Sequence, residues 1–260
     1  MKNHKYIEQN LAEQIDDINI EYFETIGSTN DYLLEKEFTS KYHFCYADIQ
    51  TKARGRRGDK WISEDKDNIY ATLGFHCDFN ISGDSLKSIK IALGVLQAIQ
   101  KYILPEQQKY LKIKLPNDIY FKDQKLAGIL IETKNIKKDN FDIIIGVGIN
   151  VNMFNLNENI DREWTSLAII NNQQVDSSQL MVSLVKQIVS LFDMSDEKAL
   201  VELSKYDYTL GKKITFTYDN QLIKGTAKGI SKELKLNILS DDNKFFEFDL
   251  ANVSKIRVVK

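Results

Sequence analysis

The sequence predicts a mixed α+β fold in which a mostly antiparallel sheet with helices is followed by a small β-barrel. Three observations support this prediction. Four strand-like segments follow one another between residues 111 and 150, with connections too short for βαβ crossovers. Helical periodicities flank them, and after Gly211 only short strand patterns remain. We therefore expect a large domain over residues 1–209 and a small barrel over residues 210–260.

The first hundred residues alternate strand and helix patterns. Ser28 or Thr29 can cap a helix over residues 30–38, which lies between two strand-like segments. Apolar residues then recur at helical spacing from Ser85 to Leu104, where Pro105 is expected to end the helix. The strands expected in this part are 21–26, 43–50 and 69–76.

The rest of the chain gives a sheet, two helices and the barrel. Helical patterns return at 177–193 and 196–206. The strands expected in the sheet are 111–115, 118–121, 126–133 and 142–150. The strands expected in the barrel are 212–218, 221–230, 233–239, 244–250 and 254–259.

Composition is that of a folded protein without a strong charge. The chain has 260 residues, is 43% hydrophobic, and balances 35 basic against 37 acidic side chains. This argues against disorder and against a global field that would attract nucleic acid. Cys45 and Cys77 lack metal-like or CxxC spacing, so we expect two core thiols. Neither a signal segment nor an apolar run of membrane-spanning length is present, which predicts a cytoplasmic protein without membrane contact.

Arginine is rare, and most of it is clustered. Three of the five arginines, Arg54, Arg56 and Arg57, fall within four positions, interleaved with Gly55 and Gly58. The guanidinium fork suits carboxylates and phosphates, and glycine lets the backbone approach a ligand. The run Ala53–Gly58, called the Arg/Gly loop below, is therefore a candidate anion site. A solvated loop or a nucleic-acid contact is the alternative.

A second candidate lies where two strands meet. Pro116 fixes a turn that directs Asn117 and Asp118, and Lys125 begins an apolar strand. A lysine at such a position can stabilise charge that develops on a phosphate or acyl oxygen. The alternative is a hairpin with a solvated lysine.

Other features are weaker. Gly146 and Gly148 lie on one face of a strand and leave a flat surface for a thin planar ligand, although a bulge or close packing explains them equally well. Trp61 can stack on a ring or be partly buried. No nucleophile with its base and no metal cluster can be assembled, so any catalysis must rely on positioning and charge stabilisation.

The order and spacing of these segments resemble the biotin-protein ligases, from about residue 21 to the C-terminus. The resemblance is carried by Ser28-Thr29-Asn30, by Gln50 with the Arg/Gly loop and Trp61, by Lys114-x-Pro-Asn-Asp, by Lys125-Leu-Ala-Gly-Ile-Leu-Ile-Glu132 and by Gly146-x-Gly-Ile-Asn150. It implies a class II synthetase-like catalytic domain followed by an SH3-like barrel. The implied reaction makes biotinyl-5′-AMP from biotin and ATP, and then biotinylates a lysine of a biotin carboxyl carrier protein.

The resemblance also implies roles for residues. It makes Lys125, Arg56 and Asp118 catalytic. The biotin-binding residues that it implies are Ser28, Thr29, Asn30, Gln50, Arg54, Arg56, Lys125, Gly128 and Gly148. The ATP- or adenylate-binding residues that it implies are Arg54, Arg56, Arg57, Trp61, Lys114, Asn117, Lys125, Asn150 and Trp164. Mg²⁺ is expected to accompany ATP, without a resident metal site in the protein.

Three residues depart from the family pattern. Ala53 stands in place of glycine, Leu115 in place of a commoner tryptophan, and Asp59 in place of a basic or neutral residue. None removes an anion donor, so we expect altered affinity before lost activity. Bifunctional relatives carry an N-terminal DNA-binding domain, for which the 27 residues before Ser28 are too few. We therefore expect the monofunctional type, without repressor activity or DNA binding, and leave a homodimer open.

Three rival interpretations are kept. A lipoate- or octanoate-protein ligase shares the fold and the adenylate chemistry, but the Arg/Gly loop and the barrel favour biotin. A nucleic-acid-binding module would use the same loop and barrel, although the near-neutral charge argues against it. An inactive scaffold is the third alternative, and the intact arginines and Lys125 argue against it.

Overall fold

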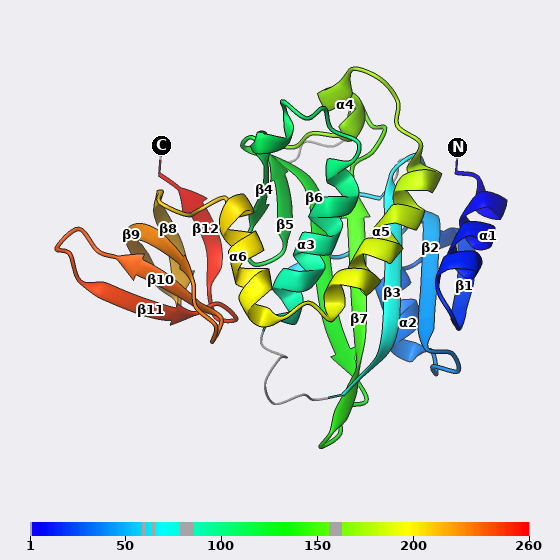
Figure 1. Cartoon of the computed structure of the whole chain (residues 1–260), viewed down its shortest axis with the longest axis horizontal. Coiled ribbons are helices and arrows are strands. Elements are labelled where there is room, and N and C mark those ends of the chain that lie inside the picture. Colours follow the sequence, from blue (N-terminus) through cyan, green and yellow to red (C-terminus); the bar gives the residue numbers. More distant parts are fainter. Residues whose placement is uncertain (1, 59–60, 64–65, 79–85, 156–162, 260) are drawn as a thin grey trace.

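The molecule is built around a seven-stranded sheet that extends beside a second, five-stranded sheet (Figure 1). The structure, a computed structural model, describes residues 2–58, 61–63, 66–78, 86–155 and 163–259. The larger sheet has the order β1-β2-β3-β7-β6-β5-β4. Its strands are β1 (Ile18–Ile26), β2 (Tyr42–Gln50), β3 (Ile69–Asp78), β4 (Leu111–Lys114), β5 (Asp118–Phe121), β6 (Gln124–Lys134) and β7 (Asn140–Ile149).

All neighbours in this sheet are antiparallel except β1 and β2, which run parallel. The exception arises because α2 (Thr29–Glu35) connects them as a crossover helix. Ser28 caps α2 by accepting a hydrogen bond from the backbone N–H of Asp31, so of the two predicted caps it is the one used. The mixed, mostly antiparallel sheet is thus confirmed.

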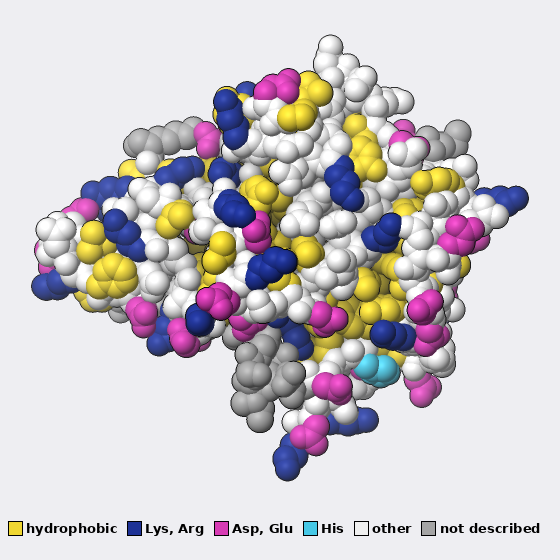
Figure 2. All heavy atoms as spheres, in the orientation of Figure 1, with side chains coloured by type: hydrophobic (Ala, Val, Ile, Leu, Met, Phe, Trp, Pro, Cys, Tyr) yellow, Lys and Arg dark blue, Asp and Glu magenta, His cyan; other side chains and the backbone are white. Residues whose placement is uncertain are grey.

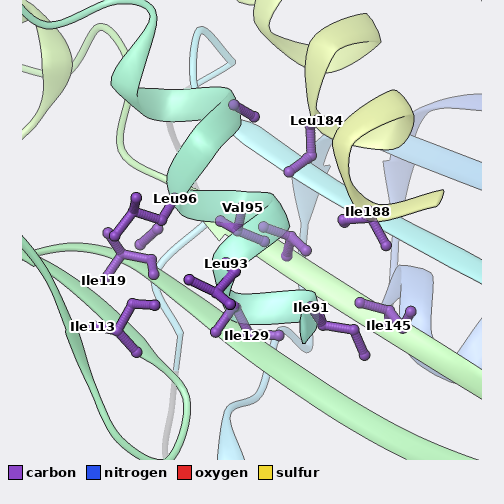
Figure 3. Packing of buried hydrophobic residues seen from close by; sticks show 14 of the residues in the cluster. Ile91, Leu93, Val95, Leu96, Ile113, Ile119, Ile129, Ile145, Leu184 and Ile188 are labelled. Atoms are coloured by element: carbon purple, nitrogen blue, oxygen red, sulfur yellow. The ribbon is translucent and has the colours of Figure 1, made fainter. Parts of the chain in front are cut away.

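Helices cover both faces of the larger sheet. α3 (Lys87–Gln100) and α5 (Ser177–Phe192) pack together on one face, in front of the sheet in Figure 1. Leu93 and Ile91 of α3 lie against Ile129 of β6 and Ile145 of β7 in the core (Figure 3). Truncating one such buried aliphatic side chain to alanine typically costs about 2–5 kcal/mol. Leu33 of α2 packs on the opposite face of the sheet. It meets the strand side chains that point away from α3 and α5, since successive residues of a strand point to opposite sides.

Several features of the helices differ from the predictions. The helix expected over residues 30–38 runs from Thr29 to Glu35, and α4 (Leu167–Asn171) was not predicted. α3 ends at Gln100, before the predicted end at Leu104, because the N–H groups of Tyr102 and Ile103 bond to the carbonyls only three residues back. Ile103 is buried nonetheless, so the apolar stripe runs past the end of the helix. The expected start of this helix at Ser85 lies outside the described residues. A helix absent from the predictions, α1 (His4–Gln14), buries Ile7 and Leu11 against α5. The remaining helices are η1 (Arg56–Gly58), η2 (Gln108–Tyr110), α4 (Leu167–Asn171) and α6 (Asp196–Tyr206).

The second sheet is antiparallel, with the order β11-β10-β9-β8-β12, and forms the small C-terminal barrel that was predicted. Its strands are β8 (Lys213–Tyr218), β9 (Gln221–Ile230), β10 (Lys235–Leu239), β11 (Phe245–Asp249) and β12 (Ser254–Val258). The chain passes from α6 to β8 through residues 207–212. A domain boundary after residue 209 stays a prediction.

Two further points concern the whole described chain. Cys45 and Cys77 are both buried and form no disulfide, as expected of two core thiols, and burial raises the pKa of Cys45. Among the described residues, no helix is both long and apolar enough to cross a membrane.

Candidate active site

A cavity of about 900 Å³ lies over the larger sheet, a volume typical of small-molecule sites. The start of α2, the Arg/Gly loop, β4 to β7 and the last strand, β12, all contribute to its wall. Among the described residues that line it, six side chains are cationic and three are carboxylates. The cavity is therefore net positive in a chain that is nearly neutral.

Four hydrogen-bonding residues of the cavity wall form what we call its polar end, namely Ser28, Thr29, Asn30 and Gln50. The backbone N–H and hydroxyl of Thr29 approach Oε1 of Gln50 at 2.8 and 3.0 Å. Oγ1 of Thr72 on β3 lies 2.8 Å from the Thr29 hydroxyl oxygen. Ser28, Thr29 and Asn30 are all buried. Buried groups held in this way are fixed in direction before a ligand enters.

Asn30 is held from both sides. Its Nδ2 donates to Oε2 of Glu132 at 2.9 Å, and its Oδ1 accepts from Oγ1 of Thr72 at 2.7 Å. A Cβ at Gly146 would lie only 2.0 Å from Oδ1 of Asn30. Gly146 is therefore required for close packing, which was one of the two explanations that the sequence left open.

Trp61 lies on the flat surface that the glycines create. Gly128 and Gly148 are direct partners across β6 and β7, and a Cβ at either one would lie within 2.7 Å of an indole ring carbon. The Nζ of Lys125 stands 5.1 Å from the Trp61 ring centroid, within cation–π range. The planar group on this surface in the structure is thus the protein's own tryptophan, and contact of either glycine with biotin stays a prediction.

The Arg/Gly loop begins with an arginine that is already engaged. Nη1 of Arg54 contacts Oε1 of Glu132 at 2.8 Å, and Nη2 contacts Oδ1 of Asp31 at 2.6 Å. These hydrogen bonds, first with Glu132 and then with Asp31, raise the pKa of Arg54 above its usual value. Arg56 lines the cavity. The Arg57 side chain and residue Asp59 lie outside the described part of the structure.

Four cationic residues of the cavity wall form what we call its basic end, namely Lys114, Lys125, Lys255 and Arg257. Nζ of Lys125 lies 2.8 Å from Oδ1 of Asp118, and both side chains are largely buried. The two groups form an ion pair whose geometry is not that of a hydrogen bond. Nζ of Lys114 donates to the Tyr120 hydroxyl at 3.2 Å. Within the described residues no cluster of three or more His, Cys, Asp or Glu side chains could hold a metal ion.

The remaining predicted residues hold segments together. Asn117 donates from Nδ2 to the carbonyl of Ile129 at 2.9 Å while it also lines the cavity. Nδ2 of Asn150 donates to the carbonyl of Thr165 at 3.0 Å, and Trp164 bridges to the backbone of Lys125. Asn150 and Trp164 are not among the described residues of the cavity wall. An adenine contact for these two residues stays a prediction.

Several residues of the wall were not foreseen. Lys255 and Arg257 of β12 reach the cavity from the end of the chain. Tyr208, between α6 and β8, also lines it, and its hydroxyl donates to Oδ1 of Asp123 at 2.7 Å. Arg257 carried a signal, because it is one of only five arginines in the chain. Nothing local indicates that β12 lines the same cavity as β4 and β5.

Comparison with known proteins gives consistent results. The model of the biotin/lipoate A/B protein ligase family matches residues 22–150. The bifunctional ligase/repressor BirA of Escherichia coli is 28% identical over 236 residues, which cover 88% of this chain and 71% of that protein. The biotin–[acetyl-CoA-carboxylase] ligase of Mycobacterium tuberculosis is 28% identical over 144 residues, 55% of this chain and 51% of that protein.

A solved structure shares the fold over almost the whole length. The biotin protein ligase of Aquifex aeolicus, in complex with biotin and ATP, matches with a TM-score of 0.77 at 24% identity. The match covers 94% of this chain and 100% of that chain, so both the larger sheet and the barrel belong to the common fold.

Proposed function

We propose that this chain, which belongs to the biotin/lipoate A/B protein ligase family, is a biotin-protein ligase that uses ATP. In the first step a biotin carboxylate oxygen attacks the α-phosphorus of ATP, pyrophosphate leaves, and biotinyl-5′-AMP forms. In the second step the neutral ε-amine of an acceptor lysine attacks the acyl carbon, AMP leaves, and the nitrogen loses its proton. The acceptor that we propose is a biotin carboxyl carrier domain of a carboxylase.

The observation that carries this proposal is a single cavity with a polar end and a basic end. The ureido ring of biotin has one acceptor and two N–H donors, which suit the paired groups of Ser28, Thr29, Asn30 and Gln50. At the other end, a carboxylate and a triphosphate repel each other unless cations lie between them. The lysines and Arg257 of the basic end supply such cations.

Within this scheme, Lys125 is the central catalytic residue. Its ammonium lies beside Asp118 and faces the cavity, where it can stabilise the charge on the α-phosphate oxygens in the transition state. Asp118 fixes the position of that ammonium. Arg56 would hold the carboxylate and phosphate from the Arg/Gly loop, and Lys114 and Asn117 the phosphate end.

Magnesium enters as part of the nucleotide substrate. Mg²⁺ is usually held by one or two carboxylates together with substrate phosphates, which agrees with Asp118 and Asp123 in the wall. We therefore propose Mg·ATP as the substrate, bound mainly through the phosphates.

The rival functions make different demands on the polar end. Lipoate and octanoate lack a ureido group, so they would gain no hydrogen bonds from the polar side chains of Thr29, Asn30 and Gln50, whereas biotin can add its own to them. A nucleic-acid module needs an excess of basic charge, whereas the chain balances 35 basic against 37 acidic side chains. On the face that carries α3 and α5, side chains of both signs are interspersed (Figure 2). The absence of repressor activity and a homodimeric assembly stay predictions.

The test is transfer of biotin to a defined acceptor. Purified protein, Mg·ATP, biotin and a biotin carboxyl carrier domain are incubated, and the product is detected by streptavidin blot and intact mass. We expect one added biotin at one lysine, and none when that lysine is replaced by arginine. Transfer of lipoyl or octanoyl groups in place of biotin would show that the chain is a lipoate- or octanoate-protein ligase instead.

A further inference from the structure

The guanidinium of Arg54 is clasped between carboxylates from two different elements, Asp31 of α2 and Glu132 of β6. Nε and Nη2 donate to Oδ1 of Asp31 at 3.1 and 2.6 Å. Nη1 and Nη2 donate to Oε1 and Oε2 of Glu132 at 2.8 and 2.9 Å, which is a bidentate pair. All three guanidinium nitrogens are thus used inside the protein.

Glu132 connects this arrangement to the polar end. The Oε2 that accepts from Arg54 also accepts from Nδ2 of Asn30 at 2.9 Å. Asn30 in turn accepts from the Thr72 hydroxyl. A continuous chain of hydrogen bonds therefore runs from the Arg/Gly loop to the residues proposed to bind the ureido ring.

We infer that Arg54 is a positioning residue, a latch that ties the Arg/Gly loop to α2 and β6, and not an anion ligand. This inference rests on the proposed function for what the loop does, and it replaces the family-derived role of Arg54 in holding biotin and phosphate. An anion that approached Arg54 would also meet the negative charges of Asp31 and Glu132, which carry more charge than the arginine neutralises. Arg56, two residues later, lines the cavity from an anchored loop.

A double-mutant cycle separates the two roles. The variants are Arg54→Gln, Glu132→Gln and the pair of them, and the readout is biotinyl-adenylate lost to solution, measured as AMP formed without acceptor biotinylation. A latch predicts that each single variant loses more adenylate than the parent protein does. The double variant should stay within about three-fold of the worse single variant, since all three variants remove the same interaction. A direct anion ligand predicts that the two effects multiply, and that result would overturn the latch.

The conservative variant Arg54→Lys sharpens the distinction. Lysine supplies a point charge that can still serve a phosphate, but it cannot make a bidentate pair with Glu132 while it reaches Asp31. A latch therefore predicts that Arg54→Lys loses adenylate about as fast as Arg54→Gln. Retention within about two-fold of the parent protein, with Arg54→Gln much worse, would support a ligand role instead.

A matched control comes from an exposed pair in the barrel. Lys235 and Glu247 lie 3.5 Å apart, with side chains about half exposed, and neither lines the cavity. The same cycle with Lys235→Gln and Glu247→Gln should change adenylate loss in none of its variants, since exposed pairs couple weakly.

A readout that needs no substrate keeps this inference separable from the proposed function. Hydrogen exchange of the backbone amides of residues 53–58 is measured in the ligand-free protein, with thermal melting to confirm that each variant is folded. Arg54→Gln and Glu132→Gln should accelerate exchange by similar factors, and the barrel amides should not change. Unchanged exchange in both variants would overturn the latch. If the loop responds as expected but the parent protein makes no biotinyl-adenylate, the latch stands and the proposed function fails.

Discussion

The polar end and the basic end of the cavity differ in what they do to a ligand. At the polar end the donors and acceptors of Thr29, Asn30 and Gln50 are paired within the protein before any ligand arrives. At the basic end Lys114, Lys125, Lys255 and Arg257 gather positive charge over β4 to β6 and β12. The first arrangement selects a ligand by shape and hydrogen bonds, whereas the second stabilises charge that increases during a reaction.

The difference predicts two kinds of mutational effect. Changes at the basic end should slow chemistry and leave the fold intact, because the charges there act on the transition state. Changes at the polar end should cost folding stability or acid specificity, because the buried groups there are interdependent.

Lys125→Ala is the largest effect expected. Loss of one preorganised charge at a developing anion typically costs about 10²- to 10³-fold in rate, so single-turnover adenylation should fall by that factor while biotin affinity changes little. Lys112→Ala on the neighbouring β4 serves as the control. Nζ of Lys112 donates to the exposed carbonyl of Lys205, so this variant should change neither the adenylation rate nor the biotin affinity. A collapse of biotin affinity with intact adenylation would contradict the role assigned to Lys125.

Arg56→Gly tests the loop at the same end. Loss of a charged hydrogen bond costs about 1.5–3 kcal/mol, so roughly 10- to 100-fold weaker retention of biotinyl-adenylate is expected. The released adenylate should biotinylate bystander lysines, which a streptavidin blot of added serum albumin detects. If bystander labelling equals that of the parent protein, Arg56 does not retain the intermediate.

Gly146→Ala tests the polar end. The new Cβ would lie 2.0 Å from Oδ1 of Asn30, whose hydrogen bonds to Thr72 and Glu132 would have to shift. Such overpacking typically costs about 1–3 kcal/mol, measured as the free energy of unfolding in urea. Gly27→Ala is the matched control, because its Cβ would meet nothing closer than Cδ of Lys52 at 4.0 Å. Equal stability of the two variants would show that Asn30 is not held as described.

The smallest effect concerns pH and lies outside both ends. Burial, and next the charge of Lys36, lowers the pKa of His43, whose Nε2 accepts the N–H groups of Thr39 and Ser40 at 2.9 and 3.0 Å. The unfolded chain therefore takes up this proton more readily, and folding stability should fall as the pH drops below about 6.5. His43→Gln should lessen that slope in urea unfolding at pH 7.5 to 5. A slope as steep as in the parent protein would exclude His43 as its source.

Local patterns predicted most of the fold, because strands and amphipathic helices leave short-range signals. The antiparallel run from β4 to β7, the helices α5 and α6, and the five barrel strands all follow from periodicity and turns. The helix α1 was missed because only Ile7 and Leu11 are buried in an otherwise polar segment. The parallel pairing of β1 with β2 was missed because it depends on the crossover by α2 and not on either strand.

The candidate site was foreseen only where the chain keeps its residues close or where a motif marks them. Lys125 and Asp118 meet across one hairpin, so their proximity follows from a short connection. The clasp on Arg54 joins three distant segments, and no local pattern distinguishes a ligand-binding arginine from one held by Asp31 and Glu132. Arg257 reaches the cavity through the packing of the barrel. Such contacts depend on tertiary structure.

The most direct test of the account is ATP–pyrophosphate exchange in the presence of Mg²⁺, run in parallel with biotin, lipoate and octanoate. Exchange is expected with biotin alone, because only biotin brings a hydrogen-bonding ring to the polar end while it places a carboxylate at the basic end. Exchange with lipoate or octanoate but not with biotin, or with none of the three acids, would contradict it.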